Sequence, residues 1–114
     1  MSRAVADGVL VEICRTGDVP LGEGRSVTLH GRRLAVFHTR AGWHALDDSC
    51  PHRGGPLSDG ILAERCVACP LHDRRFDLAT GAALTDGAPV TAHRVILRGD
   101  AVLIEVAGEL SRAA

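Results

Sequence analysis

The chain has 114 residues, 46% of them hydrophobic, which suits one globular domain and is too short for two independent cores. A formal net charge of −1, with one Trp, two Phe and no Tyr, argues against a nucleic-acid-binding surface. The sequence has no apolar run that could cross a bilayer and no signal-peptide pattern, so we expect a soluble cytoplasmic protein. In that reducing compartment, the four cysteines are expected to be metal ligands or free thiols.

Short β-rich runs separated by turn residues predict an all-β fold. In chain order the runs are Val9–Cys14, Ser26–Leu29, Arg33–Thr39, Trp43–Leu46 and His93–Val106. His30–Gly31 is typical of a hairpin turn, Ala41–Gly42 turns the chain into the fourth run, and Gly99–Asp100 divides the last run into two strands. No stretch outside the termini has the pattern of a long helix. We therefore predict an antiparallel β-sandwich or small barrel.

A segment of different character, about residues 47–80, interrupts this pattern. It contains three of the five prolines and the most unusual arrangement of cysteines and histidines. We expect it to form a small loop-rich subdomain inserted into the sheet framework. The whole chain, residues 1–114, is expected to be one domain.

Two short motifs each combine a cysteine, a proline and a histidine: "CPHRGGPL" and "CPLHDRRF". The candidate ligands are Cys50, His52, Cys69 and His72, spaced as C-x-H, sixteen residues, then C-x-x-H. Thiolate and imidazole are ligands that zinc and iron sites prefer, so the pattern predicts a bound metal. Glycines at 54 and 55 would let the backbone approach the metal closely.

A structural Cys₂His₂ zinc site would use the same ligand types. The C-x-H spacing counts against zinc, which usually has two or more residues between paired ligands. "CVAC", residues 66–69, does offer a C-x-x-C that could join His72 and Cys50. The spacing alone therefore does not decide between a zinc site and an iron site.

The motifs resemble those of Rieske iron–sulfur proteins, in which two histidines replace two cysteines on one iron of a 2Fe–2S cluster. The likeness includes "CPHRGGPLSDG", "CPLH", "RFDLATG" and the terminal strand pair, and covers about residues 9–106. The resemblance implies one cluster per chain, with Cys50 and Cys69 on the inner iron and His52 and His72 on the outer iron. Replacing two thiolates by neutral imidazoles makes the oxidised site less negative and raises its reduction potential.

The resemblance also indicates which kind of Rieske protein this is. High-potential relatives carry an extra cysteine in each loop and a Ser and a Tyr that donate hydrogen bonds to the cluster. The matching positions here are Gly55, Leu71, Arg74 and Phe76. Without those hydroxyl donors we expect the low end of the Rieske range, roughly −150 mV. Asp73 stands where such sequences have Gly, and Pro89 matches a proline of a third loop.

The implied function is single-electron transfer between redox proteins, with no substrate turnover by the chain alone. "AVFHTRAGWHALDDSCPHRGGPL" resembles the small subunit of an NAD(P)H-dependent nitrite reductase, which we slightly favour. Its redox partners would be a large reductase subunit upstream and a sirohaem reductase downstream. The alternative is the ferredoxin component that links a flavin reductase to a ring-hydroxylating dioxygenase or related terminal oxygenase. A zinc-stabilised interaction module is a third possibility.

The remaining candidates have structural explanations beside any functional one. Arg53, Arg74 and Arg75 flank the proposed ligands and form either a docking face or a solvated rim. The other cysteines, Cys14 and Cys66, are expected to pack as small apolar side chains. The other histidines, His30, His38, His44 and His93, are expected to be ordinary surface or strand residues.

Overall fold

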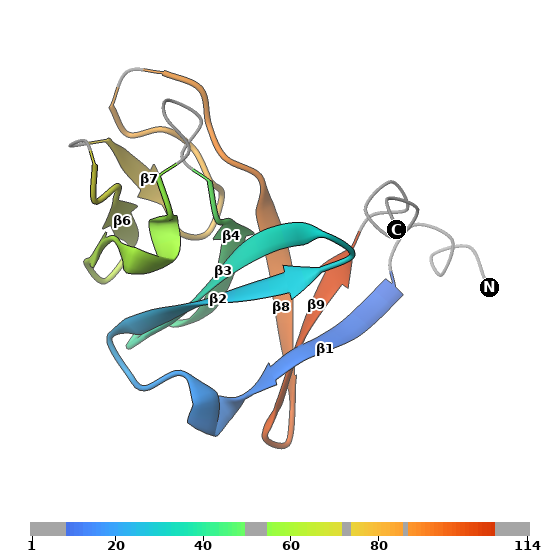
Figure 1. The fold of residues 1–114 in the computed structure, drawn as a ribbon. Coiled ribbons are helices and arrows are strands. Elements are labelled where there is room, and N and C mark those ends of the chain that lie inside the picture. Colours follow the sequence, from blue (N-terminus) through green and yellow to red (C-terminus); the bar gives the residue numbers. More distant parts are fainter. Residues whose placement is uncertain (1–8, 50–54, 72–73, 86, 107–114) are drawn as a thin grey trace.

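The computed structural model describes residues 9–49, 55–71, 74–85 and 87–106. Its larger sheet has six antiparallel strands in the order β1-β9-β8-β4-β3-β2. These strands are β1 (Val9–Arg15), β2 (Glu23–Leu29), β3 (Arg32–Thr39), β4 (Gly42–Asp47), β8 (Ala92–Arg98) and β9 (Ala101–Val106). The sheet is curled, as Figure 1 shows, and its edge strands β1 and β2 come into contact. The prediction of an all-β antiparallel fold is confirmed.

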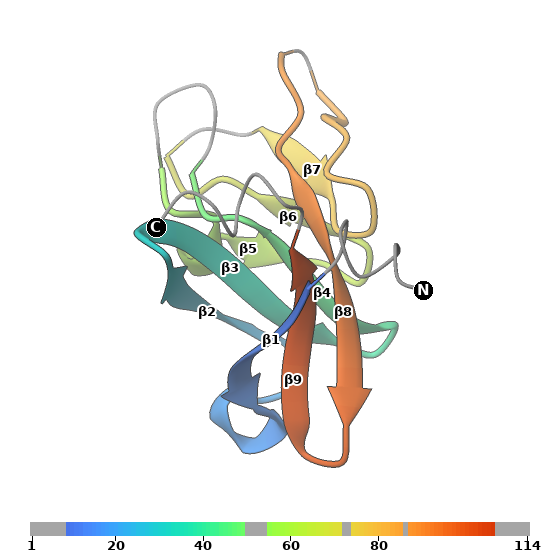
Figure 2. The ribbon, with the colours of Figure 1, turned by 90° about the vertical axis from the view of Figure 1, so that its right-hand side faces the viewer.

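A second sheet has three short strands in the order β5-β6-β7. They are β5 (Ile61–Leu62), β6 (Cys66–Ala68) and β7 (Arg75–Asp77), and all pair antiparallel. Figure 2 shows this small sheet at one end of the larger one. The region expected to be loop-rich therefore has its own sheet, whose strands are too short to leave a periodic pattern in the sequence.

Two single-turn 3₁₀ helices complete the described elements: η1 (Thr16–Asp18) after β1, and η2 (Leu57–Asp59) before β5. Within the described ranges, no helix has the length and apolar character that crossing a membrane requires.

The turns follow from backbone freedom at particular residues. His30 and Gly31 connect β2 to β3 with positive φ angles of 52° and 77°, as a two-residue type I′ hairpin turn requires. The β3–β4 turn is Arg40–Ala41, one residue earlier than predicted, because Gly42 already pairs with Thr39 in the ladder. Gly42 has φ 129°, a conformation that other residues rarely adopt.

Strand β3 is buried on both faces and joins the two halves of the core. Leu34 packs with Ala45 and Ile104 inside the curled sheet. Ala35 and Phe37 point the other way, into a cluster shared with the small sheet. That second cluster consists of Ala35, Phe37, Leu46, Leu57, Val67, Cys69, Phe76, Leu78 and Val90. The small sheet is thus fixed to the larger one by apolar packing that includes a predicted ligand.

Candidate metal centre

Cys69 lies directly after β6, at the start of the loop that connects β6 to β7. Its backbone N–H donates a 2.8 Å hydrogen bond to the carbonyl oxygen of Arg74 and so closes this loop. The residue is only 3% exposed and packs against Leu57, Val67 and Phe76. The second motif is therefore a hairpin loop whose cysteine faces the core.

The first motif comes into contact with this cysteine at Gly55. A Cβ added to Gly55 would lie 2.9 Å from Cys69 Sγ and 3.0 Å from Leu71 Cδ1, so no larger residue fits without movement. This is the close backbone approach that the sequence predicts at position 55. It places the end of one motif against the sulfur of the other, as a metal centre shared by both motifs requires.

The other three predicted ligands, Cys50, His52 and His72, lie outside the described residues, as do Arg53 and Asp73. Their assignment therefore stays a prediction. What the described residues contribute is the position of Cys69 and the contact of Gly55 with its sulfur. A buried thiol with another loop's backbone against it fits a cluster bound between the two loops.

The segment between β7 and β8 also approaches the second motif. The guanidinium of Arg74 packs directly against Gly87, where a Cβ would collide with Nη1. Gly87 has φ 118°. Pro89, the predicted proline of a third loop, lies two residues further on and is exposed. Three chain segments thus meet on this side of the small sheet.

Phe76 stands at the position where high-potential Rieske proteins have a tyrosine. Its ring is 1% exposed and belongs to the same apolar cluster as Cys69. A phenyl ring donates no hydrogen bond, so this position stabilises the site by packing alone.

The geometry of β6 argues against zinc bound by Cys66 and Cys69. Val67 and Cys69 are both buried, while Cys66 and Ala68 are half-buried. Side chains alternate between the two faces of a strand, so Cys66 points away from the face that Cys69 occupies. The C-x-x-C pair is therefore poorly placed to share one metal ion.

The cysteines and histidines outside the motifs have structural roles, as predicted. Cys14 and Cys66 are half-buried free thiols, and burial together with Asp18 and Glu12 raises the pKa of Cys14. His93 Nε2 lies 2.9 Å from Asp47 Oδ1, which ties β8 to β4. His38 stacks on Trp43 at 4.2 Å between ring centroids.

His30 occupies its exposed turn, and His44 is half-buried on β4. Burial lowers the pKa of His44 although Asp77 acts in the opposite direction. Its Nε2 is buried and has no hydrogen-bond partner among the described residues. Both His30 and His44 are therefore structural residues of the larger sheet and its turns.

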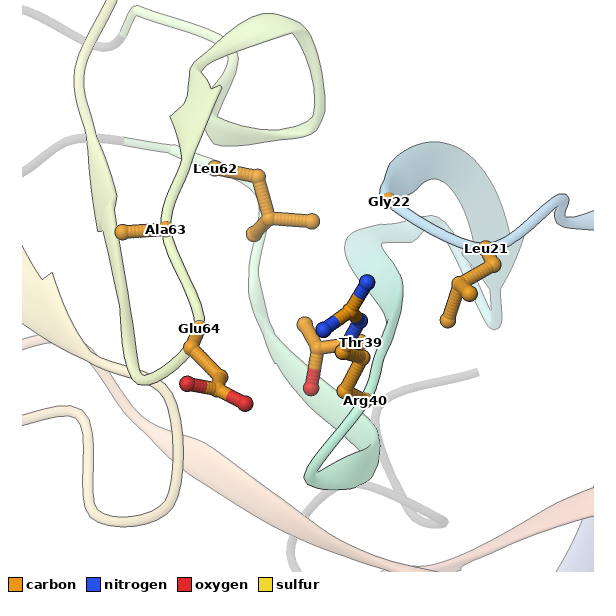
Figure 3. A pocket seen from close by; sticks show the side chains of 7 residues that line it. All are labelled: Leu21, Gly22, Thr39, Arg40, Leu62, Ala63 and Glu64. Atoms are coloured by element: carbon orange, nitrogen blue, oxygen red, sulfur yellow. The ribbon is translucent and has the colours of Figure 1, made fainter.

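A groove of about 330 Å³ lies at the opposite end of the small sheet, beside the β5–β6 turn (Figure 3). Its lining residues are Leu21, Gly22, Thr39, Arg40, Leu62, Ala63 and Glu64. Arg40 and Glu64 approach it from opposite sides. Cys69, the predicted ligand that lies within the described residues, does not line this groove.

Asp48 and Ser58 hydrogen-bond to each other across the first motif, and neither is among the predicted site residues. The only signal was their position, since they flank "CPHRGGP" in the sequence. Nothing in composition or spacing indicates that Asp48 is buried.

Comparison with known proteins agrees with this geometry. Residues 9–98 match the Rieske [2Fe-2S] domain. The chain is 38% identical over 93 residues to the ferredoxin component of a naphthalene 1,2-dioxygenase system from Pseudomonas aeruginosa, covering 78% of this chain and 88% of the relative.

Two solved structures are also similar. One is a putative nitrite reductase NADPH small subunit, with TM-score 0.77 and 28% identity over 84% of this chain and 97% of the other. The second is the ferredoxin of carbazole 1,9a-dioxygenase from Nocardioides aromaticivorans IC177, with TM-score 0.77 and 27% identity over 83% and 95%.

The matched domain and the ferredoxin relatives imply a Rieske 2Fe–2S cluster as the cofactor. Cys69 and Gly55 fit that cofactor, because a buried cysteine sulfur and a backbone without a side chain meet where the two motifs come together. The chain belongs to the Rieske [2Fe-2S] family and is an electron-transfer ferredoxin of that family.

Proposed function

We propose that this ferredoxin is the electron-carrying component of a ring-hydroxylating dioxygenase system or a related oxygenase system. The observation that carries the proposal is the 38% identity to a naphthalene dioxygenase ferredoxin, which extends over most of both chains. In such a system a flavin reductase would supply electrons and a terminal oxygenase would receive them.

The second candidate is the small subunit of an NAD(P)H-dependent nitrite reductase, slightly favoured by the sequence alone. The likeness to a putative small subunit of that class supports it, with the same TM-score as the carbazole dioxygenase ferredoxin. The fold therefore supports both candidates equally. The preference for the oxygenase system rests on the higher sequence identity of its relative.

The proposed ligands are Cys50, His52, Cys69 and His72. When bound, the 2Fe–2S cluster takes up and releases one electron, and no substrate bond is made or broken. The chain holds and shields the cofactor. Cys69 supplies a thiolate from within the apolar cluster, and Leu57 and Phe76 pack beside it and exclude water from that side.

The surface next to the second motif has the character of a docking site. Leu71 is 60% exposed although it is apolar, and it precedes the proposed ligand His72. Arg75 is exposed, Arg74 is partly buried, and Arg53 follows His52 in the sequence. Arginines around an apolar centre attract an acidic partner surface and speed its association.

The test is reconstitution with candidate partners. The purified protein would be mixed with a flavin reductase and a naphthalene-type terminal oxygenase, and separately with the large subunit of a sirohaem nitrite reductase. The expected result is faster NAD(P)H-driven reduction of the oxygenase than of the nitrite reductase. Nitrite-dependent turnover that requires this protein, with no electron transfer to the oxygenase, would instead establish the second candidate.

A further inference from the structure

Asp48 is a buried carboxylate that the electron-transfer chemistry does not require. It lies directly after β4 and is 1% exposed, with its side chain at 0%. A carboxylate is costly to bury unless hydrogen bonds and opposite charge compensate for the lost water. The contacts that Asp48 makes therefore indicate its role.

Ser58 donates two of the three hydrogen bonds to the Asp48 carboxylate, and Arg33 donates the third. Asp48 Oδ1 accepts a 2.7 Å hydrogen bond from the backbone N–H of Ser58. Asp48 Oδ2 accepts a 2.9 Å bond from the Ser58 hydroxyl and a 3.1 Å bond from Arg33 Nη2. The backbone N–H of Asp48 also donates to the carbonyl oxygen of Arg33, at 3.0 Å.

Asp48 and Ser58 are the two ends of one chain segment. Asp48 precedes Cys50 by two residues, and Ser58 follows the "CPHRGGP" motif in η2. Their hydrogen bonds hold the two ends of this segment together, and Arg33 ties them to β3 of the larger sheet. Within the same segment, Gly55 lies against Cys69 Sγ.

We propose that Asp48 is a positioning residue for the 2Fe–2S cluster. Its carboxylate holds together the two described ends of the segment in which Cys50 and His52 stand in the sequence, and so keeps Gly55 against Cys69 Sγ. Holding these ends together before the cofactor binds removes part of the conformational entropy that ligation would otherwise have to remove. The proposal rests on the ligand assignment in the proposed function.

Two variants separate this role from general stabilisation. Asp48→Asn keeps an oxygen for the Ser58 N–H but places an amide where Arg33 needs an acceptor. Ser58→Ala removes one hydroxyl and leaves the backbone hydrogen bond to Asp48, so it tests the closure even if Asp48→Asn folds poorly. The matched control is Asp59→Asn, because Asp59 is an exposed carboxylate in the same 3₁₀ helix.

The first measurement is the rate at which the purified protein loses its cluster to an iron chelator, followed by visible absorbance. Loss of a charge-assisted hydrogen bond should open the loop more often and speed cluster loss about tenfold in Asp48→Asn. Ser58→Ala should show a smaller increase of about threefold, since a neutral hydrogen bond is weaker. Asp59→Asn should match the unchanged protein.

The second measurement is amide hydrogen exchange in the same proteins as purified. The Ser58 N–H is itself the donor to Asp48, so it reports loop opening directly. Asp48→Asn should speed exchange at Gly55, Leu57 and Ser58 and leave exchange in β8 and β9 unchanged. Equally faster exchange throughout both sheets would overturn the proposal, because Asp48 would then stabilise the whole fold. Unchanged exchange together with an unchanged rate of cluster loss would also overturn it.

These outcomes are distinct from failure of the proposed function. Unchanged protein that binds no cluster, or that reduces neither partner, would count against the proposed function. If the unsubstituted protein carries electrons but Asp48→Asn changes neither the rate of cluster loss nor amide exchange, only the positioning role is wrong.

Discussion

Gly55 and Cys69, fourteen positions apart in the chain, meet so closely that a methyl group on Gly55 would stand 2.9 Å from the cysteine sulfur. Real Cβ atoms almost never come this near to another heavy atom, so the contact requires glycine here. It is the point at which the structure joins the two ligand motifs.

Gly55→Ala is therefore expected to impair cluster binding. The added methyl must displace the Cys69 thiolate or the Leu71 side chain, at a cost of about 1–3 kcal/mol for overpacking. Iron and acid-labile sulfide per chain should fall, as measured by colorimetric assay. Gly17→Ala is the control, because a Cβ there meets nothing within 4 Å. Normal cluster content in Gly55→Ala would show that the contact does not constrain the site.

The assignment of the proposed histidine ligands can be tested by comparing His72 with His38, a histidine of strand β3 outside the motifs. His72→Ala should lose the native visible and electron paramagnetic resonance spectrum, because the outer iron would lack one ligand. His38→Ala removes the stacking on Trp43 and a contact of 2.9 Å from Nδ1 to the carbonyl oxygen of Val19. It should lower stability by about 1 kcal/mol and leave the spectrum unchanged. A native spectrum in His72→Ala would contradict the ligand assignment.

The sequence predicts the parts of this molecule that follow from local patterns. The hairpin turn at His30–Gly31 was predictable because a glycine-containing pair separates two β-rich runs, and the positive φ angles at both residues confirm it. The spacing of the two motifs pointed to the metal centre without any structure. Strands β5–β7 were not predictable, because pairings of two or three residues leave no periodicity. The burial of Asp48 and the contact of Arg74 with Gly87 depend on segments distant in the chain.

Acid should weaken the fold partly through Asp47. Burial alone would raise the pKa of Asp47, but hydrogen bonds from His93 and Arg32 outweigh it and lower the pKa below 3.8. A pKa lower in the folded than in the unfolded state gives stability that is present above the unfolded value and lost as pH falls through the folded one. We therefore expect stability to decline as the pH drops below about 4.

Asp47→Asn is the matched test of this pH dependence. It should lower the free energy of unfolding by on the order of 1 kcal/mol at neutral pH, because the charged partner of Arg32 is lost. The difference in the free energy of unfolding between Asp47→Asn and the unsubstituted protein should shrink in acid. Urea unfolding at neutral pH and below about pH 4 measures it. A constant difference at all pH values would show that Asp47 does not contribute to the acid sensitivity.

Charge reversal near the first motif should slow electron transfer to the redox partner. Arg53→Glu is expected to reduce the association rate several-fold at low salt, and the effect should fade as added salt screens the charges. Arg98→Glu, at the exposed end of β8, changes the net charge equally and should have little effect. Stopped-flow reduction across ionic strengths measures both. Equal rates for the two variants would indicate that Arg53 belongs to a solvated rim.

The reduction potential tests the interpretation of Phe76. Hydrogen bonds to the cluster sulfurs stabilise the reduced state, and the buried phenyl ring supplies none. We expect a value near the low end of the Rieske range, roughly −150 mV, that stays flat through neutral pH in film voltammetry.

Phe76→Tyr adds the hydroxyl that high-potential relatives have at the matching position. One new hydrogen bond of about 1 kcal/mol corresponds to a rise on the order of 40 mV for a one-electron couple. Phe37→Tyr inserts the same hydroxyl into the same apolar cluster from β3 and should leave the potential unchanged. If the unchanged protein already has a high, pH-sensitive potential, other donors replace the missing hydroxyls, and the low-potential assignment from Arg74 and Phe76 is wrong.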